Sequence, residues 1–381
     1  MSDHLRLRPT TTIAMLAVYD DSAVIAHALA FEAALARAQA VEGLIDTAAA
    51  ETIAATCASL PIDPAELAED AALAGTLAIP LVARLRGALP DAVAPLAHKG
   101  ATSQDVADTV IMLQAKIAGS LLGADLDRIV AALAMVARDH AVTPAIGRTL
   151  LQDALPIGFG LRIAQWQAGI AVATERLRRD IADHACLQLG GAAGTRAGMN
   201  GKGAAVAAHM AQSLGLVDAP PWQARRSGVA AIASSLAILI GALAKMARDI
   251  SLLAQVAVGE AREPVIAGRG GSSAMAHKRN PTGCQVALAA AARAPGLVAG
   301  ILSGMAQEEE RGLGGWQAEG PVVADLFLLA AGSAAALARV AAELDIDPAA
   351  IARNLDAAQV GADIGESAAI VAALLAPTPK G

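Results

Sequence analysis

The chain has 381 residues, with 29 Lys or Arg against 36 Asp or Glu, so its formal net charge is −7. Hydrophobic residues make up 55%, which excludes a disordered chain. The acidic balance argues against a nucleic-acid-binding protein, which needs a net basic face. Aromatic residues make up only 2%, and alanine dominates the apolar content, so helix formers prevail over strand formers. The composition therefore predicts an all-α protein.

Three cysteines, Cys57, Cys186 and Cys284, lie far apart and form neither a C-x-x-C pair nor a metal-ligand spacing. A secreted disulfide framework would need more of them. We therefore expect a reducing, cytoplasmic environment.

The first 97 residues indicate short helices. An apolar pattern at helical spacing begins near Phe31 and continues to Ile45, and frequent prolines punctuate the chain from there to residue 97. We expect an N-terminal helical domain over residues 1–97.

The longest predicted helix begins next. Thr102-Ser103-Gln104-Asp105 has the T-x-x-D form of a capping box. No proline occurs between Pro95 and Pro144. A helix from Ser103 to about His140 would be about 55 Å long at 1.5 Å per residue. The apolar stripe that supports it consists of Val106, Val110, Leu113, Ile117 and Leu121.

Three later stretches also predict long helices: 222–263, 285–304 with Pro295 inside, and 322–344. Residues 227–244 carry no charge and reach the lower edge of a membrane span, but the helical pattern continues through charged residues. We therefore expect a buried bundle helix and no membrane contact.

Helices of this length extend beyond the core that a single compact chain can form. We expect a central bundle over residues 98–345 whose outer faces are buried by other subunits, followed by a truncated C-terminal helical segment over 346–381.

A glycine-rich loop over 268–283 breaks the helical order, as does another over 190–203. The loop over 268–283 carries Ser272, Ser273, His277, Lys278 and Arg279. The Asn280-Pro281 pair at its end is typical of the N-cap and first residue of a helix. Hydroxyls and cations before a helix start favour an anion site. The alternative is an ordinary surface loop.

Two other polar stretches leave the function open. The residues from His98 to Asp105 could bind a carboxylate at a helix start, or they could simply cap the helix. Gln152 lies in an apolar run, where a structural glutamine is the favoured interpretation. The 7 histidines do not cluster at ligand spacing, so no metal is predicted.

GSSAMAHKRNP at 271–281 resembles the G-S-S-x-M-P-x-K-x-N-P signature of the fumarase/aspartase superfamily, with Ala276 in place of the proline. Four other stretches are similar to the bacterial 3-carboxy-cis,cis-muconate cycloisomerases of that superfamily. They are HKGATSQDVADT at 98–109, RTLLQDALPIGFGL at 148–161, LGGAAGT at 189–195 and ERGLGGWQAE at 310–319. The resemblance covers roughly residues 10 to 360.

The resemblance implies a fumarase/aspartase-like fold assembled as a homotetramer, with each site built from three subunits. It implies closure of 3-carboxy-cis,cis-muconate to 4-carboxymuconolactone in protocatechuate degradation, without a metal or nucleotide cofactor. The ligand is then a small di- or tricarboxylate, and the chemistry requires stabilisation of an aci-carboxylate dianion.

The resemblance also implies roles for individual residues. Ser273 would be the loop acid/base, with Lys278 lowering the cost of its ionisation. Arg311 is a candidate partner for a third carboxylate, since arginine binds carboxylates bidentately. The other expected substrate-binding residues are His98, Thr102, Ser103, Gln104, Gln152, Ser272, Met275 and Asn280.

Three alternatives remain open. Ala276 and the short C-terminal segment leave room for another 3-substituted muconate, such as 3-sulfomuconate. A fumarate-releasing lyase of the adenylosuccinate/argininosuccinate type is disfavoured because Leu150 stands where those enzymes carry a histidine. A non-catalytic helical scaffold is disfavoured by the retained serines and Lys278.

Overall fold

The computed structural model describes residues 4–266, 268–271, 275 and 278–376. The main helices are α3 (Asp21–Val41), α4 (Thr47–Ser59), α5 (Pro64–Ala74), α6 (Ala78–Gly87), α7 (Ser103–Asp139), α8 (Phe159–His184), α9 (Gly203–Leu214), α10 (Ser227–Leu253), α11 (Thr282–Ser303), α12 (Gly315–Ala342), α13 (Pro348–Ala358) and α14 (Ser367–Leu374). The shorter elements are α1 (His4–Leu7), η1 (Arg8–Thr10), α2 (Ile13–Val18), η2 (Ala94–Leu96), β1 (Pro144–Thr149), β2 (Gln152–Gly158), β3 (Ala261–Arg262) and β4 (Asp345–Ile346).

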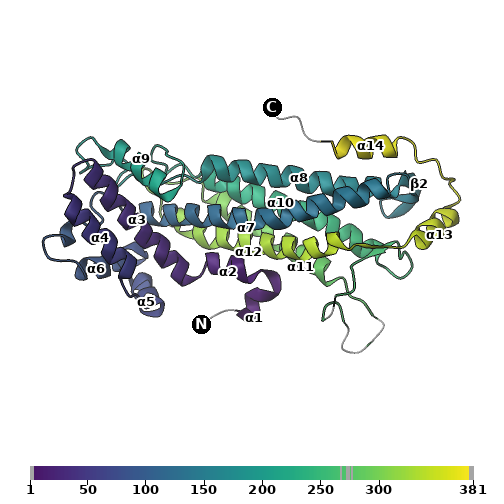
Figure 1. Ribbon diagram of the computed structural model, residues 1–381, viewed down its shortest axis with the longest axis horizontal. Coiled ribbons are helices and arrows are strands. Elements are labelled where there is room, and N and C mark those ends of the chain that lie inside the picture. The colour runs from purple at the N-terminus through teal and green to yellow at the C-terminus, as the bar shows by residue number, and fades with distance from the viewer. Residues whose placement is uncertain (1–3, 267, 272–274, 276–277, 377–381) are drawn as a thin grey trace.

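Five long helices, α7, α8, α10, α11 and α12, pack side by side as an elongated bundle (Figure 1). Small residues bring their backbones close together. A side chain at Gly160 would meet the carbonyl oxygen of Ala137 at 2.1 Å, so α8 lies directly against the end of α7 only because residue 160 is glycine. The all-α, long-bundle prediction is confirmed.

The bundle has two distinct ends. Helices α3 to α6 and α9 surround the end where α7 begins, whereas β2, α13 and α14 lie at the end where α7 finishes (Figure 1). Helix α7 runs from Ser103 to Asp139, as its capping sequence predicted. Its 37 residues separate the two ends by about 55 Å.

Helices α3, α10, α11 and α12 are long and apolar enough to span a membrane, judged by length and composition alone. In this fold α10, which contains the uncharged stretch 227–244, packs against α8, α11 and α12. Its inward side includes Leu236, Leu239, Ile240 and Leu243, all fully buried. The apolar stretch therefore supplies bundle core, as the sequence predicted.

A β-hairpin that the sequence analysis did not anticipate connects α7 to α8. Strands β1 and β2 pair antiparallel, with Thr149 opposite Gln152. The two turn residues between them, Leu150 and Leu151, have φ of 51° and 63°. Both central residues of a two-residue hairpin turn of the I′ type need positive φ, so Leu150 and Leu151 hold a conformation that leucine rarely adopts.

The first residues of two helices differ from the prediction. Helix α11 begins at Thr282 with Pro281 as its N-cap, so Asn280 lies one residue outside the helix end. Helix α12 begins at Gly315 and continues through Pro321, where the sequence predicted a start after that proline. A proline seven residues into a helix removes one hydrogen bond, and here packing against the bundle outweighs that loss.

Candidate functional site

The predicted site residues fall into two groups at opposite ends of the bundle. His98, Thr102, Ser103 and Gln104 lie where α7 begins, and Arg311 joins them from the segment before α12. Gln152, Met275, Lys278 and Asn280 belong to the hairpin and to the loop between α10 and α11, at the other end. Within one chain the two groups cannot form a single site.

Arg311 is the centre of the first group. Its Nε donates to Gln104 Oε1 at 3.1 Å, its Nη1 to Thr102 Oγ1 at 3.2 Å and its Nη2 to the carbonyl oxygen of Gly191 at 2.9 Å. Guanidinium has five N–H donors, so two remain for a ligand. The segments around residues 102, 191 and 311 therefore meet, and they present a fixed cation at a helix start.

Gln104 is completely buried, and its own amide donates to the carbonyl oxygen of Gln223 at 2.9 Å. This bond fixes which side of the amide faces Arg311, so the oxygen of Gln104 is directed at Nε. Ser103 is partly exposed beside them, on the first turn of α7. Gln104 thus orients Arg311 in this chain.

His98 lies next to this cluster in a left-handed backbone conformation, with φ of 61°. Its Nδ1 lies 2.6 Å from Oε1 of Glu32, whose side chain is fully buried. A histidine held by a buried carboxylate presents its Nε2 outward with a defined tautomer. Glu32 therefore fixes the orientation of the His98 ring, and with Nδ1–H donating to this carboxylate the neutral ring offers Nε2 as a hydrogen-bond acceptor.

Asp105 joins the start of α7 to the glycine-rich stretch 190–203. Its carboxylate accepts hydrogen bonds from the backbone N–H groups of Thr102, Gly190 and Gly191, at 2.8 to 3.1 Å. Burial raises the pKa of Asp105 to about 6, although these donors oppose the shift. The same residue caps the helix and holds the loop whose Gly191 carbonyl accepts from Arg311.

A fully buried charge triad of Arg226, Asp108 and Glu319 lies next to this cluster. Arg226 donates to both oxygens of Asp108, at 2.8 and 2.7 Å, and also to Glu319. Its guanidinium stacks on Trp222, 4.8 Å from the ring centroid. Burial raises the pKa of both carboxyl groups. Two carboxylates share one cation, so α7, α10 and α12 are locked together by a network that carries an excess negative charge.

At the other end, Gln152 is exposed and its amide donates only to the neighbouring Leu151 carbonyl, at 3.2 Å. The expectation of a satisfied glutamine in an apolar run is therefore wrong, because the hairpin projects this residue outward. The hairpin itself is anchored by Arg148, which donates to the buried Glu260 at 3.1 and 2.6 Å. An exposed amide on an anchored hairpin is free to meet a ligand or another chain.

A backbone hydrogen bond closes the base of the loop 268–283, which carries the signature-like sequence. Asn280 N donates to the carbonyl oxygen of Gly270 at 2.8 Å. The Asn280 side chain donates to the carbonyl oxygen of Gly271 at 3.2 Å, and Lys278 is exposed. Met275 is 43% exposed. The predicted residues Ser272, Ser273, Ala276 and His277 lie outside the described residues.

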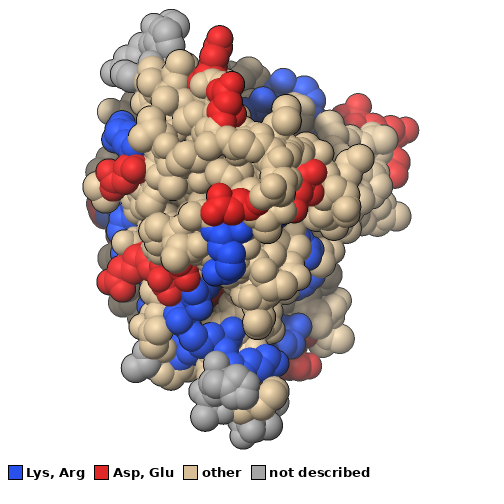
Figure 2. Space-filling view, turned by 90° about the vertical axis from the view of Figure 1, so that its right-hand side faces the viewer, with Lys and Arg blue, Asp and Glu red and all other residues tan. Residues whose placement is uncertain are grey.

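Lysine and arginine side chains gather in the lower half of the face at the hairpin end (Figure 2). Locally concentrated cations on an acidic protein suit a polyanionic ligand. Among the described residues, no group of three or more His, Cys, Asp or Glu could hold a metal ion.

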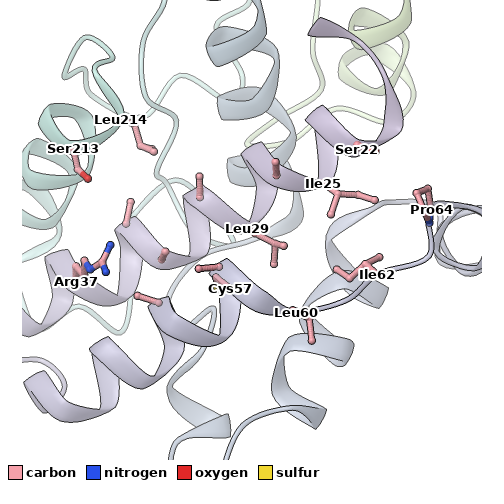
Figure 3. A pocket seen from close by; sticks show the side chains of 16 residues that line it. Ser22, Ile25, Leu29, Arg37, Cys57, Leu60, Ile62, Pro64, Ser213 and Leu214 are labelled. Atoms are coloured by element: carbon pink, nitrogen blue, oxygen red, sulfur yellow. The ribbon is translucent and has the colours of Figure 1, made fainter. Parts of the chain in front are cut away.

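A groove of about 610 Å³ between α3 and α4 contains none of the predicted site residues (Figure 3). Its only charged lining residue, Arg37, is 3.1 Å from Glu51. An apolar groove with a neutralised arginine does not suit a tricarboxylate, so it is not the candidate site.

Comparison with known proteins identifies the family to which the chain belongs. A profile of the lyase family matches residues 10–296. The 3-carboxy-cis,cis-muconate cycloisomerase of Bradyrhizobium diazoefficiens is 46% identical over 91% of this chain and 78% of the relative, and that of Pseudomonas aeruginosa is 43% identical over 90% and 75%. The crystal structure of 3-carboxy-cis,cis-muconate lactonizing enzyme from Pseudomonas putida has a TM-score of 0.88 at 39% identity, covering 93% of this chain and 80% of that one. The chain belongs to this lyase family, and the fumarase/aspartase-like fold predicted from the sequence is confirmed.

Sequence reasoning missed the residues that hold the site together. Asp108 and Glu319 lie inside the stretches 98–109 and 310–319, and their charge within otherwise buried helices was an available signal. Nothing in the sequence near Arg226 or Glu32 indicated their partners, because those contacts join residues 66 to 118 positions apart.

Proposed function

We propose that this chain is a cycloisomerase that closes 3-carboxy-cis,cis-muconate to 4-carboxymuconolactone in protocatechuate degradation. The observation that carries the proposal is Arg311, held at the start of α7 by Thr102 Oγ1, Gln104 Oε1 and the Gly191 carbonyl with two donors left over. The named cycloisomerase relatives at 43–46% identity support the choice of substrate.

The reaction is an internal addition. A carboxylate oxygen of the substrate forms a C–O bond to one end of a conjugated double bond, and a proton is delivered to the carbon next to another carboxylate. No atom is gained or lost and no oxidation state changes overall, so no oxidant, reductant or second substrate is consumed. Negative charge builds up on that second carboxylate as an aci-carboxylate, and it needs cations and helix-start donors around it.

In the proposed mechanism Arg311 binds one substrate carboxylate, and Thr102, Ser103 and Gln104 line the same helix start, with His98 beside them in the orientation that Glu32 fixes. Lys278 and Asn280 bind a second carboxylate. Ser273 would deliver the proton, and Lys278 would stabilise its ionised form. Gln152, Ser272 and Met275 would orient the substrate.

We propose that the active form is a homotetramer whose sites each combine three chains. Helix α11, which runs between the loop that carries Lys278 and the segment that carries Arg311, has 22 residues and is about 33 Å long. Leu150, Leu151 and Leu155 on the hairpin are 95%, 74% and 73% exposed, and a second chain would cover them. We further propose that the enzyme works in the cytoplasm, bound neither to membrane nor to nucleic acid.

The activity is tested by mixing the purified protein with 3-carboxy-cis,cis-muconate and following loss of the conjugated diene absorbance, with the product identified by NMR. Rapid formation of 4-carboxymuconolactone is expected. Absence of turnover by a folded protein would refute the proposed substrate, and turnover of 3-sulfomuconate alone would reassign it.

The shared-site arrangement has a separate test. At a substrate concentration near the wild-type KM, Arg311→Gln and Lys278→Ala chains should each be strongly impaired alone, and a mixture refolded or co-expressed as hybrid oligomers should recover activity, because some sites then take both intact residues. A mixture as impaired as the single variants would contradict the arrangement, whereas the diene assay on the wild type would be unaffected by that result.

A further inference from the structure

Another concentration of cations lies at the base of the loop 268–283, and it includes none of the residues assigned above. A pocket of about 250 Å³ forms where the N-terminal segment crosses α11 and α12. Its lining includes Arg8, Arg269 and Arg339 together with Thr11, Thr12 and Thr282, and it contains no acidic residue. Three arginines and three hydroxyl groups around one small cavity are the donors that oxyanions require.

The pocket is built by a close backbone approach. A side chain at Gly332 would meet the carbonyl oxygen of Thr10 at 1.9 Å, so the N-terminal segment lies directly on α12. Arg8 Nη1 donates to the carbonyl oxygen of Thr11 at 2.6 Å and folds back over the same segment. These contacts press Thr11 into the interior with only 3% of its surface exposed.

The Thr11 hydroxyl has no hydrogen-bond partner among the described residues, although it is buried. A buried hydroxyl without a partner destabilises the fold, so such groups are expected to be paired when the protein works. Thr11 lines the pocket, and a ligand there would supply the missing acceptor or donor.

The arginines have donors to spare. Arg269 makes long bonds to Thr282 Oγ1 at 3.3 Å and to the Ala336 carbonyl at 3.4 Å, and its nearest carboxylate, on Glu263, is 3.6 Å away. Glu263 is engaged by the N–H groups of residues 283 and 284, at 3.1 and 2.7 Å. Arg339 is exposed and makes no ion pair within the part of the chain that is described. The pocket therefore keeps a positive excess.

We propose that this pocket binds a small, multiply charged oxyanion, through Arg269, Arg339 and the Thr11 hydroxyl. Its volume lies below the usual range of about 300–1,000 Å³ for drug-sized ligands, which points to a phosphate-sized ion or a short dicarboxylate. Either source offers the same chemistry: negative oxygens that accept from arginine forks and a hydroxyl.

The test is a titration of the purified full chain with inorganic phosphate, and separately with succinate, at constant ionic strength. Binding is followed by calorimetry and by the rise in melting temperature. We expect saturable binding of at least one anion. Thr11→Val and Arg339→Ala should each weaken it about tenfold, the effect of one charge-assisted hydrogen bond. Arg248→Ala, which removes an exposed arginine from α10, is the matched control and should bind normally.

Thr11→Val also separates the ligand contact from a folding defect. Valine has nearly the same shape and removes the unsatisfied hydroxyl, so the anion-free variant should melt no lower than the wild type. Unchanged affinity in both pocket variants, or no saturable binding of either anion, would overturn the proposal. Loss of anion binding in Arg311→Gln instead would assign the ion to the candidate active site. The diene assay remains an independent readout of the proposed activity.

Discussion

Replacing Arg226 with methionine should destabilise the protein strongly. Among the described residues, the change removes the only cation that pairs with Asp108 and Glu319, whose side chains are 0% and 1% exposed. Removing one partner of a buried ion pair costs about 3–5 kcal/mol, because the remaining charges stay buried without compensation. At about 2.1 cal/mol/K per residue, the entropy of unfolding of a 381-residue chain is about 0.8 kcal/mol/K. The melting temperature should therefore fall by about 4–6 °C.

Calorimetric or circular-dichroism melts of three variants test this reasoning. Arg225→Met is the matched control: Arg225 is exposed and donates only to backbone carbonyls of Pro220 and Pro221, so its loss should shift the midpoint by less than about 1 °C. Glu319→Gln should cost less than half as much as Arg226→Met, since it removes the excess negative charge. Equal melting temperatures of Arg226→Met and Arg225→Met would refute the conclusion that the triad stabilises the fold.

Three further predictions concern substrate binding at the candidate site, the stability of the fold around it and the assembly of chains. Arg311→Gln should raise KM for 3-carboxy-cis,cis-muconate at least about tenfold, since a charged hydrogen bond contributes about 1.5–3 kcal/mol; an unchanged KM in steady-state assays would remove Arg311 from the substrate contacts. The raised pKa of Asp105, about 6 against an ordinary 3.8, makes its contribution to stability fully present below about pH 4 and lost as the pH rises through about 6. In urea titrations the stability of the wild type relative to Asp105→Asn should thus fall across that window, and a difference that is flat with pH contradicts this. Leu150→Asn combined with Leu151→Gly should keep the hairpin, because Asn-Gly suits the turn, yet weaken assembly; sedimentation that shows an equally tight oligomer would mean that the leucines are not interface residues.

The sequence was most informative where the signal was local. The T-x-x-D box at Thr102 and the absence of proline up to Pro144 located α7 to within a residue, because capping and periodicity act over one turn of helix. The hairpin was missed because Leu150 and Leu151 carry no turn signature. Their positive φ is imposed by the pairing of the flanking strands and not by their own preference.

Site residues were predictable only as far as the resemblance carried them. It named Arg311 and Gln104 as candidate substrate-binding residues, and in the structure Arg311 Nε donates to Gln104 Oε1 at 3.1 Å. The resemblance did not identify Glu32, which is hydrogen-bonded to His98, or Arg226. The sequence around a single charged residue in a helix does not reveal which distant residue it pairs with. Such contacts depend on how helices cross, which no short pattern encodes.

The charge triad has a consequence for the order in which the chain can fold during synthesis. Arg226 emerges 118 residues after Asp108, and Glu319 emerges 93 residues after Arg226. Arg311 is synthesised 209 residues after Thr102, to which it hydrogen-bonds. Until α12 has left the ribosome, the start of α7 lacks both its arginine and the acidic residue that ties it to α12. The end of the bundle that carries Arg311 therefore cannot close before α12 has been synthesised, and the long sequence separations predict slow completion of folding there.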